Sequence, residues 1–360
     1  MIKDNKSKVW LNEIAFMRPC LLLLLVAYHS FALYCGAWDV PVGIEQNVEA
    51  YRWIAHFTCS FLMEGFIFVS GYIFTFQLLT KNKFSSLWDL TKTKAHRLLV
   101  PCLVFGLLYT LIIESLDLSV AGLYNLLSGP GHLWFLPCLF WLFLMQYLII
   151  TYSEKKNDEE TKSTKKRLGI VAFLFLVTPV LSVIPFPFRF NQSLYYLLFF
   201  YGAGLFYKYS SAINNWTSIG KCLFLWVLLT ISVLLLYPIM DKNTESIVSA
   251  SSSIARVPYI LANLYMKIFI AWIGVTALYT TAVIYCRTHS IGKIMLKIGA
   301  CAYGAYLFHQ FILKYLYYKM EFPSYTGTMM MPWVAFLITL VLATLLTLLV
   351  RSTKVGKKYL

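Results

Sequence analysis

Long apolar runs without charged residues recur along the whole chain of 360 residues, and they restrict its fold more than any other feature. Each run is about as long as the ~20 residues that an α-helix needs to cross a bilayer. Hydrophobic residues make up 59% of the chain and charged residues only 13%. This composition argues against a soluble enzyme, a disordered chain or a disulfide-rich secreted domain. The predicted fold class is all-α, a polytopic integral membrane helical bundle.

We predict about ten transmembrane helices in a single transmembrane domain over residues 1–360. The predicted spans are about 14–34, 54–76, 98–115, 132–151, 168–185, 193–209, 221–238, 257–285, 298–318 and 332–350. The loops between them are short. Any chemistry must therefore come from residues in the spans and at their ends.

The basic residues predict the orientation of these spans. With the N-terminus inside, the segments on the inner side hold 23 Lys and Arg and those on the outer side hold five. Basic residues stay in cytoplasmic loops, so both termini are predicted to be cytoplasmic. The excess of basic residues in inner loops then explains the net charge of +15. We therefore expect a lipid bilayer as partner, and not nucleic acid. The C-terminal lysines are expected to bind anionic lipid.

Ionisable residues inside a span are costly and mark candidate functional sites. Arg18 and His29 both lie in the first span. Their spacing puts them on one helix face, about 16 Å apart along the axis. The plainer interpretation is a snorkelling Arg18 and a hydrogen-bonded interior His29. The shared face and the polar neighbours of His29 favour a functional role.

The second span contains Glu64, Gly65 and Gly71. The small residues are typical of close helix contacts. Glu64 is interpreted either as a counter-ion for Arg18 or Lys267, or as a group that holds an imidazole in one tautomer. Lys267 itself lies within a span and has no evident partner in the sequence.

Three of the six histidines, His29, His132 and His309, are predicted at similar outer depth on different helices. Three histidines can hold zinc, but no acidic residue lies nearby in the sequence to support them, so we predict no metal. A histidine-lined cavity for acid–base chemistry is favoured, because histidine titrates near neutral pH. Trp134 is expected at the outer interface, as an aromatic belt residue.

A basic stretch containing Lys94 and Arg97 immediately precedes the third span. It is either ordinary positive charge on the inner side or a binding site for a phosphate-bearing ligand from the cytosol. The sequence leaves both interpretations open.

Several of these segments resemble the membrane-bound acyltransferase-3 family. Arg18 followed by His29 resembles the family's first-span signature, and Phe66–Tyr72 resembles its "FFVLSGF" segment. Lys94 to Arg97, followed by a proline, is similar to its "RxxR…P" stretch. His132–Phe135 is similar to "HLWF", and Ala302–His309 is similar to "SYGIYLxH".

The resemblance implies transfer of an acyl group, usually acetyl, from acetyl-CoA on the cytoplasmic side to a hydroxyl of a glycan or glycolipid. It implies a multi-pass protein of the bacterial inner (plasma) membrane that takes acetyl-CoA as donor and holds no permanent cofactor. On this basis His29 is the expected catalytic residue, as general base or as covalent relay. Activity should then fall at acid pH as His29 becomes protonated. Arg18, Lys94 and Arg97 are expected to bind the donor.

Glu64, His132, Trp134 and His309 are expected to form or support the acceptor cavity. The chain departs from the family pattern at two positions. Lys94 stands where the family has Arg, which weakens a bidentate phosphate contact, and Ala302 stands where it has Ser. The family motifs contain no residue that corresponds to Glu64.

Two other functions remain open. A transporter or exporter of a polysaccharide or other anion would also place Glu64, Lys267 and Lys314 inside the membrane. Inverted repeats would support it, and the sequence shows none. A non-catalytic scaffold in a glycan-assembly complex would make Arg18 and His29 incidental, and alanine at both positions would leave its phenotype intact.

Overall fold

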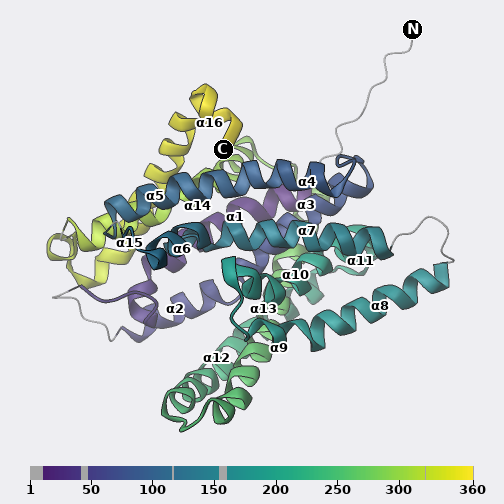
Figure 1. Cartoon of the computed structure of the whole chain (residues 1–360), viewed down its shortest axis with the longest axis horizontal. Helices are drawn as coiled ribbons and strands as arrows, with labels where there is room; N and C mark the ends of the chain where they lie inside the picture. The colour runs from purple at the N-terminus through teal and green to yellow at the C-terminus, as the bar shows by residue number, and fades with distance from the viewer. Residues whose placement is uncertain (1–10, 42–47, 116, 154–159, 321, 360) are drawn as a thin grey trace.

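The computed structural model describes residues 11–41, 48–115, 117–153, 160–320 and 322–359. These residues form helices joined by short connections, without a β-strand (Figure 1). The all-α prediction is therefore confirmed for this part of the chain. Parts of two segments that the charge pattern places inside, residues 1–10 and 154–159, lie outside the described residues.

The α-helices are α1 (Asn12–Ser30), α2 (Glu49–Cys59), α3 (Leu62–Leu79), α4 (Leu87–Lys94), α5 (Val100–Ile112), α6 (Val120–Ser128), α7 (Phe135–Ser153), α8 (Glu160–Leu176), α9 (Thr178–Ser182), α10 (Phe190–Lys208), α11 (Ser210–Trp216), α12 (Ile219–Ser249), α13 (Ser253–Thr288), α14 (Lys293–Tyr318), α15 (Phe322–Ser352) and α16 (Lys354–Tyr359). Short 3-10 helices are η1 (Ala32–Cys35), η3 (Gly131–Trp134) and η4 (Pro187–Arg189), and η2 (Ala95–Leu99) is a π-helical turn.

Each predicted span falls on a helix or on two consecutive helical segments. Among the described residues, seven helical stretches are long and apolar enough to cross a membrane, as expected of a multi-pass membrane protein. They are Asn12–Ser30, Glu49–Leu79, Leu87–Ile112, Gly131–Ser153, Ile219–Ser249, Ser253–Thr288 and Thr326–Ser352. The count of ten and the side on which each terminus lies stay predictions.

The other three predicted spans, 168–185, 193–209 and 298–318, correspond to α8 with α9, α10, and α14. α8 ends at Leu176 and α9 begins at Thr178, so no single long helix forms there. α10 and α14 are continuous but rich in tyrosine and other polar side chains. Both pack against neighbouring helices of the bundle, where such side chains find partners more easily than in lipid.

Close backbone contacts hold the central helices together. α1 packs against α3, α13 and α14, and α3 packs against α10. A Cβ atom added to Gly71 of α3 would lie 2.4 Å from the carbonyl oxygen of Phe200 in α10. Where α1 meets α14, a Cβ atom on Gly299 would lie 3.2 Å from Cδ of Pro19. The close contact predicted from Gly71 is confirmed.

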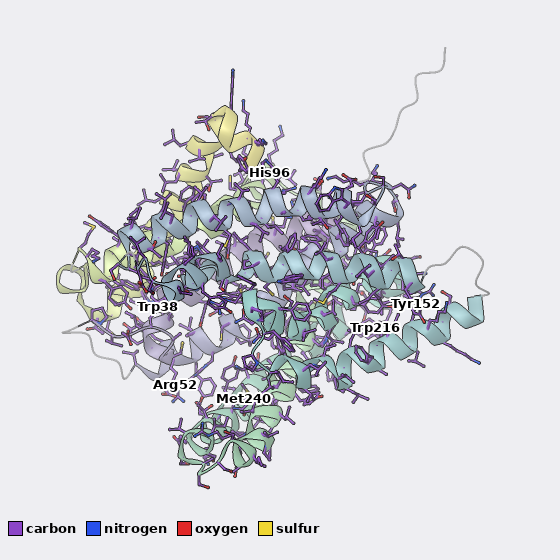
Figure 2. The ribbon with its side chains drawn as sticks, viewed as in Figure 1. Trp38, Arg52, His96, Tyr152, Trp216 and Met240 are labelled. Carbon is purple, nitrogen blue, oxygen red and sulfur yellow. The ribbon has the colours of Figure 1, made fainter. Side chains whose placement is uncertain are left out.

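Some residues predicted for opposite sides of the membrane lie apart along the long axis of the molecule. Figure 2 shows Trp38 and Arg52, both predicted to be outside, near one end of the long axis. Tyr152 and Trp216, both predicted to be inside, lie near the other end. His96 and Met240, predicted on the inner and the outer side, both lie between these two pairs, so the orientation of the spans stays a prediction.

Candidate functional site

Three histidines from three separate segments meet inside the bundle. His29 lies in the last turn of α1, His132 in η3 and His309 within α14. The ring centroids are 4.7 Å apart for His29 and His309, and 5.0 Å apart for His132 and His309. All three side chains are buried. The structure thus brings together the three histidines that the sequence places at one depth.

Backbone carbonyl oxygens determine which ring nitrogen of each histidine carries the proton. His29 Nδ1 lies 2.9 Å from the carbonyl oxygen of Leu25, and His132 Nε2 lies 3.1 Å from that of Leu307. His309 Nδ1 lies 2.6 Å from a carbonyl oxygen one turn earlier. A carbonyl oxygen only accepts, so the facing nitrogen must donate. Neutral His29 therefore keeps its lone pair on Nε2, where it can act as base or nucleophile.

A cavity of about 730 Å³, here called the histidine chamber, opens beside two of these histidines. His29 and His132 line it, whereas His309 packs behind them and is not part of the lining. Aromatic rings supply much of the remaining wall: Tyr28, Trp38, Trp134, Tyr195, Tyr196, Tyr237 and Tyr306. Trp134 stacks on Tyr196 with the ring centroids 5.9 Å apart. The volume is within the range of small-molecule sites, and the wall suits a ligand with apolar ring faces.

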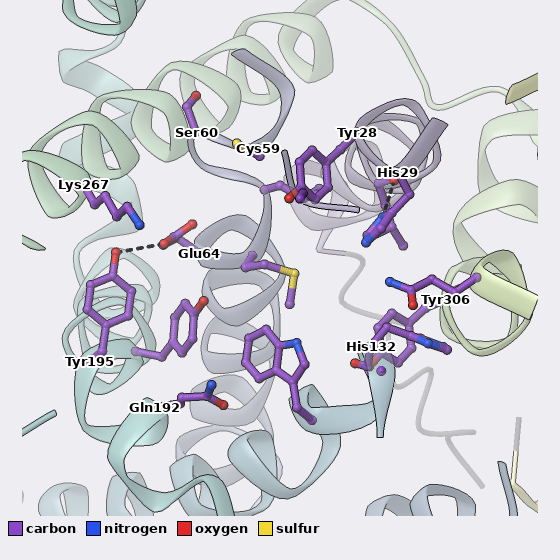
Figure 3. A pocket seen from close by; sticks show the side chains of 18 of the residues that line it. Tyr28, His29, Cys59, Ser60, Glu64, His132, Gln192, Tyr195, Lys267 and Tyr306 are labelled. Carbon is purple, nitrogen blue, oxygen red and sulfur yellow. Dashed lines mark hydrogen bonds between the residues drawn. The ribbon is translucent and has the colours of Figure 1, made fainter. Parts of the chain in front are cut away.

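The other end of the histidine chamber contains ionisable side chains (Figure 3). Glu64 of α3 accepts a hydrogen bond of 2.9 Å from the hydroxyl of Tyr195 in α10. Lys267 of α13 lies on the same side as this pair and interacts with Glu64 electrostatically. Of the roles predicted for Glu64, that of a charged neighbour of Lys267 fits the structure best. The carbonyl of Leu25, not Glu64, holds the tautomer of His29.

A second cavity, of about 260 Å³, is here called the basic cavity because Arg18, Lys94 and Arg97 line it. Arg18 comes from α1 and Arg97 from η2, and the two guanidinium groups are close enough to repel each other. Among the described residues, none of the three cations has a carboxylate within 4 Å. Positive charge without an internal partner makes this cavity a candidate anion site.

Lys94 differs from the two arginines in its surroundings. It is only 8% exposed, and its ammonium lies 3.4 Å from the ring centroid of Phe143. The rings of Phe74 and Phe84 lie at 5.4 and 5.6 Å. Cation–π contacts therefore hold Lys94 at the wall, and the arginines remain the more accessible anion ligands.

The two cavities meet at Met63 and Tyr306, which line both of them. The Tyr306 hydroxyl donates to the carbonyl oxygen of His132 at 2.5 Å, so its ring is fixed. Met63 is half-buried and flexible by nature. Arg18 and His29, on the same helix α1, therefore belong to different cavities on either side of this junction.

The structure separates the predicted site residues into two groups. Arg18, Lys94 and Arg97 line the basic cavity, whereas His29, Glu64, His132 and Trp134 line the histidine chamber. The sequence did not predict Met63, Tyr195 or Tyr306 as site residues. Tyr306 lies within the Ala302–His309 segment that resembles a family motif, so the sequence did contain a signal for it. Among the described residues, no group of three His, Cys, Asp or Glu side chains is arranged to hold a metal ion.

Comparison with known proteins gives one match, to a protein family. A family model described as an acyltransferase domain, that of the acyltransferase-3 family, matches residues 11–352, which is nearly the whole chain. No curated protein and no solved structure gave a significant match. The match covers both cavities and every helix that contributes to them. The chain therefore belongs to the acyltransferase-3 family, and its apolar helices are those of a membrane acyltransferase.

Proposed function

We propose that the protein is an O-acetyltransferase of the bacterial inner membrane. It moves an acetyl group from cytosolic acetyl-CoA to a hydroxyl of a cell-surface polysaccharide or lipid-linked sugar. One observation supports this most directly. A cavity lined by three cations and a chamber lined by histidines and aromatic rings share two wall residues, Met63 and Tyr306. Two compartments in contact suit a reaction between a charged donor and a sugar, because each can bind one of the two substrates.

The donor fits the basic cavity by charge. Coenzyme A is a polyanion, and Arg18 and Arg97 offer planar guanidinium groups that suit phosphate. Arg97 is exposed, so the phosphates can stay near the surface while the slender pantetheine arm extends inward. The thioester then lies at the junction formed by Met63 and Tyr306, next to the histidine chamber.

The acceptor fits the histidine chamber by shape and polarity. Its aromatic wall offers flat faces to the C–H groups of a sugar ring, and its polar groups offer hydrogen bonds. The stacked pair of Trp134 and Tyr196 is one such face. A hydroxyl of the bound sugar then lies beside His29.

His29 performs the proton transfer. Its Nε2 takes the proton of the acceptor hydroxyl while the hydroxyl oxygen attacks the thioester carbonyl carbon. The carbon–sulfur bond breaks, and the imidazolium returns the proton to the departing thiolate of coenzyme A. In the alternative route, Nε2 attacks the thioester carbonyl carbon and coenzyme A leaves as a thiolate; the acceptor hydroxyl then attacks the acetyl-imidazole, its proton passes to the thiolate, and His29 is released. The hydrogen bond from His29 Nδ1 to Leu25 prepares the same nitrogen for both routes.

The test is acetyl transfer from radiolabelled acetyl-CoA in inverted membrane vesicles that contain wild-type protein or His29→Ala. Label should enter a glycan or glycolipid fraction and fall by about 10²–10⁴-fold in the variant. His289→Ala is the matched control, because His289 is exposed at the end of α13, outside both cavities. If His29→Ala incorporates as much label as wild type, the catalytic role of His29 is contradicted. Glycan that crosses vesicle membranes without any acyl donor would instead favour a transporter.

A further inference from the structure

Lys267 presents a cation to the histidine chamber at the end away from the histidines. It lies on α13, which is long and apolar enough to span a membrane, and it lines the chamber (Figure 3). The residue is exposed. A charged side chain within a spanning helix costs several kcal/mol unless it faces water or a partner. The proton transfer proposed above makes no use of Lys267.

The surroundings of Lys267 leave its charge incompletely compensated. Glu64 interacts with it electrostatically, but among the described residues no carboxylate lies within 4 Å of its ammonium. Oε1 of Glu64 instead accepts the hydrogen bond from Tyr195. Glu64 thus lies beside Lys267 without forming a contact ion pair.

The charges lining the whole chamber also favour an anion. Lys267 and Lys314 contribute two cations, against the single carboxylate of Glu64. The Lys314 ammonium lies 5.4 Å from the ring centroid of Trp38 and is held there by aromatic contacts. Lys267 has no aromatic ring that holds it in this way among the described residues. It is therefore the cation available to a ligand.

We propose that Lys267 forms a subsite for an anionic group of the acceptor, a carboxylate or a phosphate ester. This inference rests on the proposed function and narrows its substrate class to acidic glycans or sugar phosphates. Binding of the anion at Lys267 would orient the sugar ring across the chamber, so that a hydroxyl at the far side of the ring meets His29. Lys267 acts here as a specificity residue, because it touches the acceptor away from the reacting atoms.

The test measures binding, so it does not depend on catalysis. Three glycosides with the same ring are titrated into purified protein in lipid nanodiscs: methyl glucoside, methyl glucuronide and methyl glucoside 6-phosphate. In wild type, an acidic glycoside should bind about tenfold or more tightly than the neutral one. Lys267→Met should remove this difference, and Lys267→Arg should retain most of it. The comparison of methyl glucuronide with methyl glucoside 6-phosphate shows whether a carboxylate or a phosphate ester is preferred.

Two controls separate charge recognition from other effects. Lys242→Met removes an exposed lysine of α12 that does not line the chamber, and it should leave the preference unchanged. Glu64→Gln should preserve or increase the preference, because it removes the competing carboxylate. Equal binding or absent binding of all three glycosides in wild type overturns the proposal, as does a preference that survives in Lys267→Met. Acetyl transfer without charge preference refutes only this subsite, whereas charge-dependent binding without transfer refutes only the proposed function.

Discussion

A methyl group added at Gly71 should loosen the bundle around the site. In Gly71→Ala the new Cβ would lie 2.4 Å from the carbonyl oxygen of Phe200, and real Cβ contacts are essentially never below 3.0 Å. The obstacle is backbone, so α3 and α10 must separate locally by about 0.6 Å. Overpacking of this kind costs about 1–3 kcal/mol. The better helix propensity of alanine returns about 0.5–1 kcal/mol, which leaves a net loss of about 1 kcal/mol between the midpoints of the two ranges.

Gly65→Ala on the same helix is the matched control. Its Cβ would lie 2.5 Å from Cδ2 of Leu21, which is the end of a side chain that can rotate away. The assay is reversible unfolding in mixed micelles with increasing SDS, which gives the free energy of unfolding of each variant. Gly71→Ala should be clearly less stable than Gly65→Ala. Equal stability of the two variants would refute the argument from backbone contact.

Two further predictions concern the junction and the donor. Met63→Ala should enlarge the passage beside Tyr306 and raise the rate with butyryl-CoA relative to acetyl-CoA by about tenfold. One methylene in a tight pocket changes a rate by that factor or more. An unchanged ratio of the two rates would argue against Met63 as the residue that limits acyl-chain length. Arg97→Ala should raise the KM for acetyl-CoA by about tenfold with little change in kcat, because a charge-assisted hydrogen bond to phosphate is lost. A kcat effect without a KM effect would place Arg97 outside the donor site.

The apolar runs predicted helix positions well, but they could not predict where a helix breaks. The predicted span 54–76 is in fact α2 and α3, which are interrupted between Cys59 and Leu62. The Ser60 hydroxyl donates to the carbonyl oxygen of Phe57 at 2.8 Å at this break. Cys59 and Ser60 line the histidine chamber, and irregular backbone at membrane depth is tolerated where it lines a cavity. Hydropathy reports burial in lipid and contains no signal for such a turn.

The candidate site was predictable where depth in the membrane carried the information. The positions of His29, His132 and His309 along their spans predicted a common depth, and the structure brings their rings together at that depth. The pairing of Glu64 with Tyr195 was not predictable, because it depends on which helices are neighbours and which faces they share. A single sequence of mostly apolar helices contains little information on either point.

If the basic cavity binds the donor as proposed, its two arginines would link donor supply to the lifetime of the protein. Arg18 and Arg97 repel each other, and among the described residues neither has a carboxylate partner, so their repulsion weakens the folded state. A polyanion bound there removes the repulsion and adds stability by mass action, about 2.7 kcal/mol at a concentration 100 times its Kd. A cell short of such an anion would therefore hold more of the protein in partly opened forms that membrane proteases degrade. The amount of the protein in the membrane would then follow the metabolic state of the cell without any dedicated regulator.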